Sequence, residues 1–192
     1  VAFSDSDVNL FSDINRSDDK GFAAKSGFVS TRNPDWLQGY QLNTMAELEY
    51  NSATFSFIDR YRYIEFDRDW SLSQEDLEHN VAEKFFKVQV EVIKDTENVA
   101  SYQSNLRNRG DVLSGIQQSM KLNQKVGKRL FFANDLFLLN SKVRELQSNW
   151  IRYNGSVEFR SKIFVPGYKL NIDRNKSRAI KSDSIPNSLP SV

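Results

Sequence analysis

Trp150-Ile-Arg-Tyr-Asn-Gly-Ser-Val-Glu-Phe-Arg-Ser-Lys-Ile-Phe164 is the stretch that indicates the fold most strongly, because apolar and polar residues alternate along it. Successive side chains of an extended strand point to opposite faces of a sheet. One face would carry Ile151, Tyr153, Gly155, Val157, Phe159 and Ile163, and the other Arg152, Asn154, Ser156, Glu158, Arg160 and Lys162. The stretch therefore predicts one long strand with an apolar side and a polar side.

The length of this stretch separates it from ordinary strands. Strands of soluble proteins average about 5–6 residues, whereas a tilted strand that crosses a bilayer needs ~9–11 residues. Aromatic residues near its ends are typical of the interface girdles of a membrane barrel: Trp150, Tyr153, Phe164 and then Tyr168. We therefore expect an all-β fold, an antiparallel meander of long strands that forms a transmembrane β-barrel or a sector of a larger one. The expected lipid-facing residues are Ile151, Tyr153, Val157, Phe159 and Ile163, and the expected lumen-facing residues are Arg152, Asn154, Ser156, Glu158, Arg160 and Lys162.

The rest of the chain is expected to supply similar strands, separated by turns rich in polar residues and glycine. Residues 71–83 are the exception, because Ser73-Gln-Glu-Asp resembles a helix capping box and predicts a short helix or loop. A loop is also expected at 141–148. Residues 1–175 would then form the barrel segment, with seven to nine antiparallel strands, and 176–192 a linker-like tail. Strands are expected at 1–11, 21–30, 38–51, 84–94, 99–107, 112–126, 129–140 and 150–164, and again from Tyr168.

Composition and charge exclude several classes of protein. The 192 residues include 26 Lys and Arg against 25 Asp and Glu, so the net charge of +1 gives no bias toward nucleic acid. No run of ~18 apolar residues could form a transmembrane helix, whereas half of each strand in a barrel with a wet lumen is polar. Without cysteine the chain has no disulfide and no thiol nucleophile. It starts at Val1 with no signal-peptide pattern, so we expect that a signal peptide has been removed. It ends in a linker-like composition with no closing aromatic strand, so we expect the chain to be an excerpt of a longer protein.

Two patterns contain residue types that bind metal ions. Asp5-Ser-Asp-Val-Asn9 with Asp13-Ile-Asn15 offers acidic oxygen ligands for calcium, but the glycine and glutamate of an EF-hand loop are missing at the required positions. His79 is the only histidine, so a multi-histidine zinc or iron site cannot form within the chain. The sequence therefore predicts a solvated turn, a surface histidine and no metal ligand.

Three carboxylates lie close together in the sequence and are the candidates for a catalytic acid and base. Glu65, Asp67 and Asp69 could supply the acid and base of a hydrolase. They alternate with other residues, so in a strand they would share one face, with arginines nearby to neutralise them. Neutralised lumen charges are the favoured interpretation, and we expect no catalytic residue, no cofactor-binding residue, no cofactor and no enzyme activity.

Alternation alone does not distinguish lipid from a protein core, because the strands of a soluble β-sandwich also alternate. The alternative hypothesis is a soluble, extracytoplasmic β-sandwich that binds glycan or protein through exposed aromatics such as Tyr61, Tyr63 and Trp70. The two hypotheses differ in what covers the apolar side chains. Acyl chains cover them in the barrel, and a second layer of protein covers them in the sandwich.

Four segments of the chain carry a resemblance to a known group of proteins: Ala2-Phe-Ser-Asp-Ser-Asp-Val-Asn-Leu-Phe-Ser-Asp13, Lys20-Gly-Phe-Ala-Ala24, Arg60-Tyr-Arg-Tyr-Ile-Glu-Phe-Asp-Arg-Asp-Trp70 and Phe164-Val-Pro-Gly-Tyr168. They resemble large outer-membrane β-barrel proteins of Bacteroidota, a group similar in style to the barrel translocon of the type IX secretion system. The resemblance implies the outer membrane of a Gram-negative bacterium, a barrel wall, and a non-catalytic role in transport, secretion or surface assembly. The expected partners are outer-membrane lipid and other protein subunits or the rest of a longer chain, with no nucleic acid.

Overall fold

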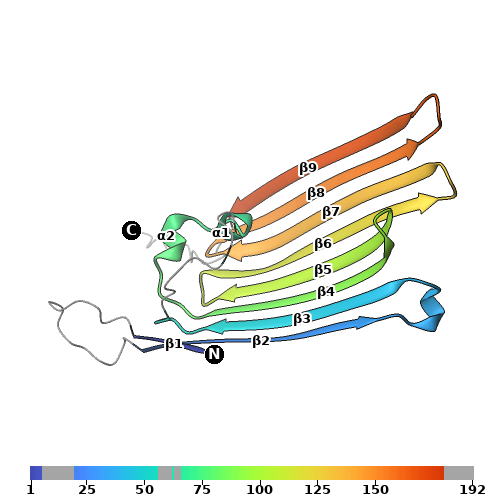
Figure 1. The fold of residues 1–192 in the computed structure, drawn as a ribbon. Helices are drawn as coiled ribbons and strands as arrows, with labels where there is room; N and C mark the ends of the chain where they lie inside the picture. The colour runs from blue at the N-terminus through green and yellow to red at the C-terminus, as the bar shows by residue number, and fades with distance from the viewer. Residues whose placement is uncertain (6–19, 56–61, 63–65, 180–192) are drawn as a thin grey trace, which may run out of the picture.

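The computed structural model describes residues 1–5, 20–55, 62 and 66–179, and its strands form one antiparallel sheet (Figure 1). Each strand pairs with the next one along the chain, so the all-β meander predicted from the sequence is confirmed. The sheet is open, with β1 at one edge and β9 at the other. The nine strands are β1 Ala2–Asp5, β2 Lys20–Arg32, β3 Gln41–Asn51, β4 Glu83–Asp95, β5 Asn98–Arg109, β6 Leu113–Val126, β7 Leu130–Val143, β8 Leu146–Phe159 and β9 Gly167–Ala179.

The strands are long, as the sequence predicts: β2 to β9 each contain 11 to 14 residues. This is about twice the length of an average strand in a soluble protein. β9 continues to Ala179, so the boundary expected at residue 175 falls inside a strand, and residues 180–192 lie outside the described part of the chain.

The decisive stretch is a strand with shifted ends. β8 begins at Leu146, and the loop expected at 141–148 is instead a two-residue turn in which Arg144 has a φ of 51°. A residue with positive φ reverses the chain within a tight turn, so pairing resumes at once. The strand ends at Phe159, before the expected end, because the Ser161 hydroxyl accepts the backbone N–H of Phe164 at 3.0 Å and closes a loop. The strand predicted for 150–164 is therefore wrong at both ends.

The connection between β3 and β4 carries the two α-helices, α1 (Phe66–Asp69) and α2 (Gln74–Leu77), with a 3₁₀ turn, η1 (Asp35–Leu37), between β2 and β3. Figure 1 shows both helices at one end of the sheet. α2 lies within the segment expected as a short helix or loop. α1 contradicts the strand-like alternation read for Asp67 and Asp69, because a helical turn does not place alternate residues on one face. No helix in the described residues is long and apolar enough to cross a membrane.

A small apolar core lies where this connection meets the sheet. Trp70 is fully buried at its centre. Gly115 of β6 makes room for it, because a β-carbon at that position would lie 3.0 Å from the Trp70 ring and 2.9 Å from the Ser141 β-carbon. The core therefore covers only one end of one face of the sheet. Its buried residues are Phe66, Trp70, Leu72, Phe85, Val112, Leu113, Leu139 and Val143.

Candidate functional site: the two faces of the sheet

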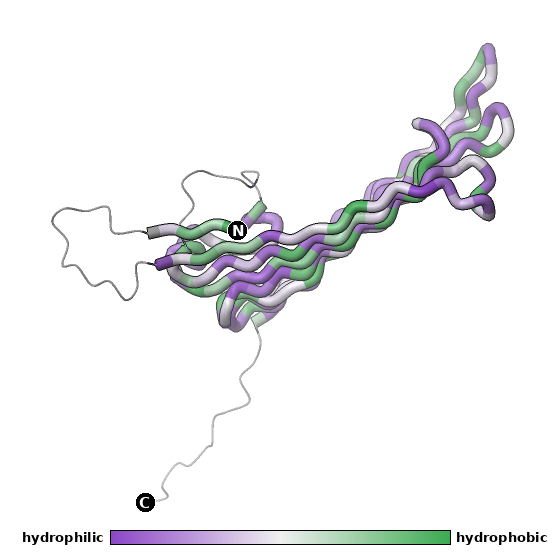
Figure 2. Tube along the Cα trace, turned by 60° about the horizontal axis from the view of Figure 1, so that its bottom comes forward, coloured by the Kyte–Doolittle hydropathy of each residue, from purple (hydrophilic) through white to green (hydrophobic). Residues whose placement is uncertain are grey.

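The sheet has one apolar face and one polar face along most of its length. In Figure 2 hydrophobic and hydrophilic residues alternate along the strands. The pairing register brings the alternating sets of neighbouring strands into phase, so that Leu138 of β7 lies beside Ile151 of β8. The same register leads from Val88 of β4 to Ala46 of β3. The apolar phases of separate strands therefore combine into one continuous surface.

This surface, the apolar belt, remains exposed in the described structure; Ile151, for example, has 45 % of its surface accessible. Nothing among the described residues covers it, because α1 and α2 pack on the other face. The belt consists of Phe22, Phe28, Leu42, Ala46, Leu48, Tyr50, Phe86, Val88, Val90, Val92, Ala100, Tyr102, Leu106, Ile116, Met120, Leu122, Val126, Leu130, Phe132, Leu136, Leu138, Ile151, Tyr153, Val157, Phe159, Tyr168, Leu170 and Ile172.

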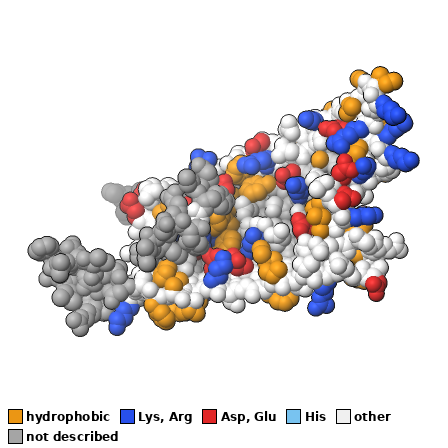
Figure 3. Space-filling model, in the orientation of Figure 1, with side chains coloured by type: hydrophobic (Ala, Val, Ile, Leu, Met, Phe, Trp, Pro, Cys, Tyr) orange, Lys and Arg blue, Asp and Glu red, His pale blue; other side chains and the backbone are white. Residues whose placement is uncertain are grey.

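The two faces differ sharply in charge. From β2 to β9 no acidic residue takes a position on the apolar face, apart from Asp95, which follows the bulge at the end of β4. The polar face carries the acidic residues of these strands, interspersed with lysine and arginine, and Figure 3 shows the mixture over the end of the sheet away from the helices. Those acidic residues are Glu47, Glu49, Glu83, Glu91, Asp135, Glu158 and Asp173.

The apolar belt crosses the strands obliquely. The row of paired residues that starts at Ile172 of β9 reaches Ser30 on β2. At the end of the sheet near the helices, the belt ends at Ile172 on β9 but at Phe22 on β2, eight residues from Ser30. The drift is about one residue per strand. At ~3.3 Å per residue and ~4.8 Å between strands, the belt is inclined by roughly 38° to the row of paired residues. If the belt is perpendicular to an axis, the strands are tilted from that axis by roughly 38°. Strands of barrels are typically tilted by about 35–45° from the barrel axis.

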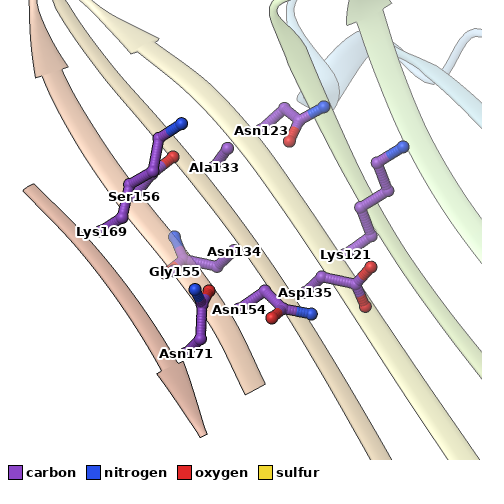
Figure 4. Close-up of a pocket in the computed structure, with 10 residues that line it drawn as sticks. All are labelled: Lys121, Asn123, Ala133, Asn134, Asp135, Asn154, Gly155, Ser156, Lys169 and Asn171. Atoms are coloured by element: carbon purple, nitrogen blue, oxygen red, sulfur yellow. The ribbon is translucent and has the colours of Figure 1, made fainter. Parts of the chain in front are cut away.

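The polar face contains an open groove of about 320 Å³ over β6 to β9 (Figure 4). Lys121 and Lys169 supply positive charge, Asp135 supplies negative charge, and asparagine side chains supply amide donors and acceptors. Such a lining can hold water and polar solutes, but it contains no nucleophile paired with a base. The lining residues are Lys121, Asn123, Ala133, Asn134, Asp135, Asn154, Gly155, Ser156, Lys169 and Asn171.

An ion network ties α1 to the polar face. The guanidinium of Arg107, with only 1 % of its side chain exposed, donates from Nε and Nη2 to the two oxygens of Glu83, each at 3.2 Å. Its Nη2 also donates to Asp67 of α1 at 2.6 Å, and its Cζ lies 4.5 Å from the Phe66 ring centroid. Because a buried charge without a partner is costly, this network holds the helical connection against β4 and β5.

The network continues along the edge of a second cavity, of about 550 Å³, between α1 and the strands. Arg62 joins Glu83 to Glu49, with 3.0 Å between Arg62 Nη2 and Glu49 Oε2, and Glu49 in turn accepts from Lys25 at 2.8 Å. Amide side chains continue this lining on β5 and β6, where Asn105 Nδ2 donates to Gln117 Oε1 at 2.7 Å. This end of the polar face is therefore narrowed by the connection and lined by fixed, paired charges.

α2 is held by a separate carboxylate. The buried Asp76 accepts the backbone N–H of Ser73 at 3.0 Å, and its other oxygen lies 3.0 Å from Arg144 Nε. Burial raises the pKa of Asp76, but the hydrogen bonds from Ser73 and the positive charge of Arg144 outweigh it and leave the pKa below its usual value. The ionised carboxylate is therefore the form that caps the helix.

The residues predicted for the two faces of the decisive stretch separate as expected within β8. Ile151, Tyr153, Val157 and Phe159 belong to the apolar belt, and Arg152, Asn154, Ser156 and Glu158 lie on the polar face. The three others lie in the loop after β8, where Ile163 is 98 % exposed and Arg160 and Lys162 are exposed. Face assignments for these loop residues therefore do not follow from strand alternation.

The candidate catalytic and metal residues do not assemble into a site. Asp67 and Asp69 lie in α1, and Glu65 lies outside the described residues, as does most of the 5–15 segment considered for calcium. His79 is exposed, with 2.6 Å between its Nε2 and Arg144 Nη2. Within the described ranges no group of three or more His, Cys, Asp and Glu could hold a metal ion.

Sequence reasoning missed the buried ion network. Its members are far apart along the chain, because Glu83 and Arg107 are 24 positions apart and Asp67 and Arg107 are 40 positions apart. Each looks locally like an ordinary charged residue of a strand or turn. Only the paired register of β4 and β5 brings them together, so no local pattern could have identified them.

No protein-family model, no curated protein and no solved structure matches this chain.

Proposed function

We propose that this chain is a sector of the wall of an outer-membrane β-barrel with a non-catalytic role in transport, secretion or surface assembly. The observation that carries the proposal is the apolar belt: exposed, continuous over eight strands and free of acidic residues in the regular part of each strand. Acyl chains stabilise such a surface, and a buried carboxylate there would be costly. The resemblance of four segments to large Bacteroidota barrels favours protein secretion among these roles.

The dimensions of the belt support this proposal. On β6 it runs from Ile116 to Val126 and on β4 from Phe86 to Val92. At ~3.4 Å per residue and the inclination derived above, these spans correspond to heights of about 27 Å and about 16 Å. The apolar band of outer-membrane barrels is ≈25 Å tall, so the belt has this height on β6 and is shorter on β4.

The polar face suits the lumen of such a wall. It carries balanced charges, the amide-lined groove and the helical connection, all on the side opposite the belt. Barrel interiors that contain water are polar, and connections that fold inward narrow them. In this proposal Arg152, Asn154, Ser156 and Glu158 face the lumen.

The sheet edges support a larger wall. β9 pairs only with β8, so the outer edge of its 13 residues has no strand partner in the described chain. Unpaired backbone groups are not tolerated against lipid. β1 and β9 run in the same direction, because neighbours alternate, so closure with only antiparallel pairs needs an odd number of further strands. We place these strands in the rest of a longer chain or in other subunits.

The alternative, a soluble β-sandwich that binds glycan or protein, requires a second sheet on the apolar belt. Among the described residues the only layer packed on the sheet is the α1–α2 connection, which covers the polar face. Trp70, one of the aromatics expected to bind a ligand in that hypothesis, is fully buried. The described structure thus offers no specific support for the sandwich.

Cysteine scanning tests the proposal directly, because the chain has no cysteine of its own. Single cysteines at Ile151, Arg152, Tyr153 and Asn154 are labelled with a polarity-sensitive fluorophore after reconstitution into vesicles. Lipids with a quencher on the acyl chain should quench positions 151 and 153 and leave 152 and 154 bright. Equal quenching at all four positions, or none at any, would overturn the proposal. A monodisperse protein without detergent, with 151 and 153 shielded from both lipid and water, would support the sandwich instead.

A further inference from the structure

Outside the bulge at the end of β4, which contains Lys94 and Asp95, the few charges on the apolar face are basic and unevenly placed. They are Lys20, Arg32, Lys84, Lys142, Arg174, Lys176 and Arg178. All except Arg32 lie at the end of the sheet where α1 and α2 pack, and the C-terminal half of β9 contributes three. Beyond Ile172 the alternation of β9 continues with basic residues in place of apolar ones. The apolar belt therefore has a basic border at one end.

The border follows the register of the sheet. Arg178 pairs with Gln147, Gln147 with Lys142, and the row continues to Lys84 of β4. Every residue of this row between β9 and β4 is basic or a neutral hydrogen-bonding residue: Arg178, Gln147, Lys142, Ser114, Asn108 and Lys84. We name this row, with Arg174 and Lys176, the basic border.

The charges of the border have no anionic partner in the part of the chain that the structure describes. None of its lysines and arginines forms an ion pair with a described residue, in contrast to the paired arginines of the polar face. Their long side chains can extend past the belt toward water while their methylene groups remain on apolar surface. An anion from outside the described chain could therefore neutralise these charges.

We propose that the basic border binds the anionic headgroups of membrane lipids, in the leaflet on the side of the α1–α2 connection. This inference rests on the proposed function and adds an orientation and a lipid class to it. Phosphate-bearing headgroups lie at the level where an apolar belt ends, and each Lys or Arg near an anionic surface contributes ≈1 kcal/mol to binding. The three basic residues of β9, Arg174, Lys176 and Arg178, would by themselves favour binding to anionic lipid by roughly 100-fold.

The test compares two vesicle types with the full chain: phosphatidylcholine alone, and phosphatidylcholine with about 30 % phosphatidylglycerol. The variant replaces Arg174, Lys176 and Arg178 with glutamine. The control replaces three lysines of the polar face, Lys121, Lys125 and Lys169, with glutamine, which removes the same charge from the other side. Vesicle flotation measures the partition coefficient, and far-UV circular dichroism checks the sheet content.

The unchanged chain and the control should prefer the anionic vesicles by on the order of 100-fold, and the border variant should lose most of this preference. A border variant with undiminished preference, or a control with an equal loss, overturns the inference. If the border variant does not fold, the inference is tested by the salt dependence of the unchanged chain's preference for anionic vesicles. At about 1 M salt, where the screening length is ~3 Å, the preference should disappear, and its persistence counts against the inference.

These outcomes are distinguishable from failure of the proposed function. A chain that inserts equally into both vesicle types, with the alternating quenching pattern intact, keeps the barrel proposal and loses the basic border. A chain that enters neither type loses both.

Discussion

A charge at the middle of the apolar belt is the perturbation that follows most directly from the structure. On β6 the belt extends from Ile116 to Val126, and Leu122 lies four residues from its nearer end. With ~3.4 Å per residue and the inclination of roughly 38°, Leu122 lies about 11 Å from the end of the belt at Val126, measured along the height of the belt. We expect Leu122→Arg to destabilise the chain in lipid by ~2–4 kcal/mol, the cost of arginine near the midplane of a barrel.

The depth dependence makes this prediction specific. Val157 lies only two residues from the end of the belt on β8, at Phe159, so Val157→Arg should cost less than Leu122→Arg. Asn123 follows Leu122 in the chain but lines the polar groove, so Asn123→Arg is the matched control and should change stability by less than ~0.5 kcal/mol.

The assay is denaturant unfolding of the chain in lipid vesicles, followed by tryptophan fluorescence, for the unchanged chain and the three variants. Equal free energies of unfolding for Leu122→Arg and Asn123→Arg would refute the reasoning, because the two faces would then be equivalent. A penalty at Leu122 that is the same in lipid-free buffer, in a protein that is folded there, would assign the belt to a protein core.

Three further predictions concern the end of the sheet near the helices. Arg107→Ala should destabilise the protein by about 1–3 kcal/mol, measured as free energy of unfolding, because Glu83 and Asp67 each lose a partner, whereas Arg62 and Arg109 still compensate Glu83. Gly115→Ala should cost about 1–3 kcal/mol and change the near-UV circular dichroism, because the added methyl group displaces the ring of Trp70. The lowered pKa of Asp76 means that its contribution to stability is fully present above the unfolded pKa of ~3.9 and is lost as the pH falls through the folded value. Hydrogen exchange in α2 should therefore accelerate in acid, and Asp76→Asn should remove this part of the pH dependence; unchanged exchange, or undiminished stability in the first two variants, would contradict these assignments.

Local sequence was sufficient to predict the all-β class of fold and the two-sided character of its strands. Alternation is a local property, set by the geometry of the extended chain, so the phase of Phe86 to Val92 or of Leu130 to Leu138 could be read without knowledge of any partner strand. The meander followed for the same reason, because turn residues separate consecutive long strands. Strand ends were predicted less well. Arg144, for example, adopts a left-handed conformation in the turn before β8, and an arginine does not indicate such a conformation in the sequence.

How these local patterns combine depends on long-range pairing, which the local sequence does not specify. The oblique course of the belt and the basic border depend on the register between strands, and register is a property of pairs. The helix α1 and the pairing of Arg107 with Glu83 and Asp67 depend on a connection folding back over the sheet, which brings together residues that are 24 and 40 positions apart. Local sequence sets which way a side chain points, whereas long-range pairing sets what it meets there.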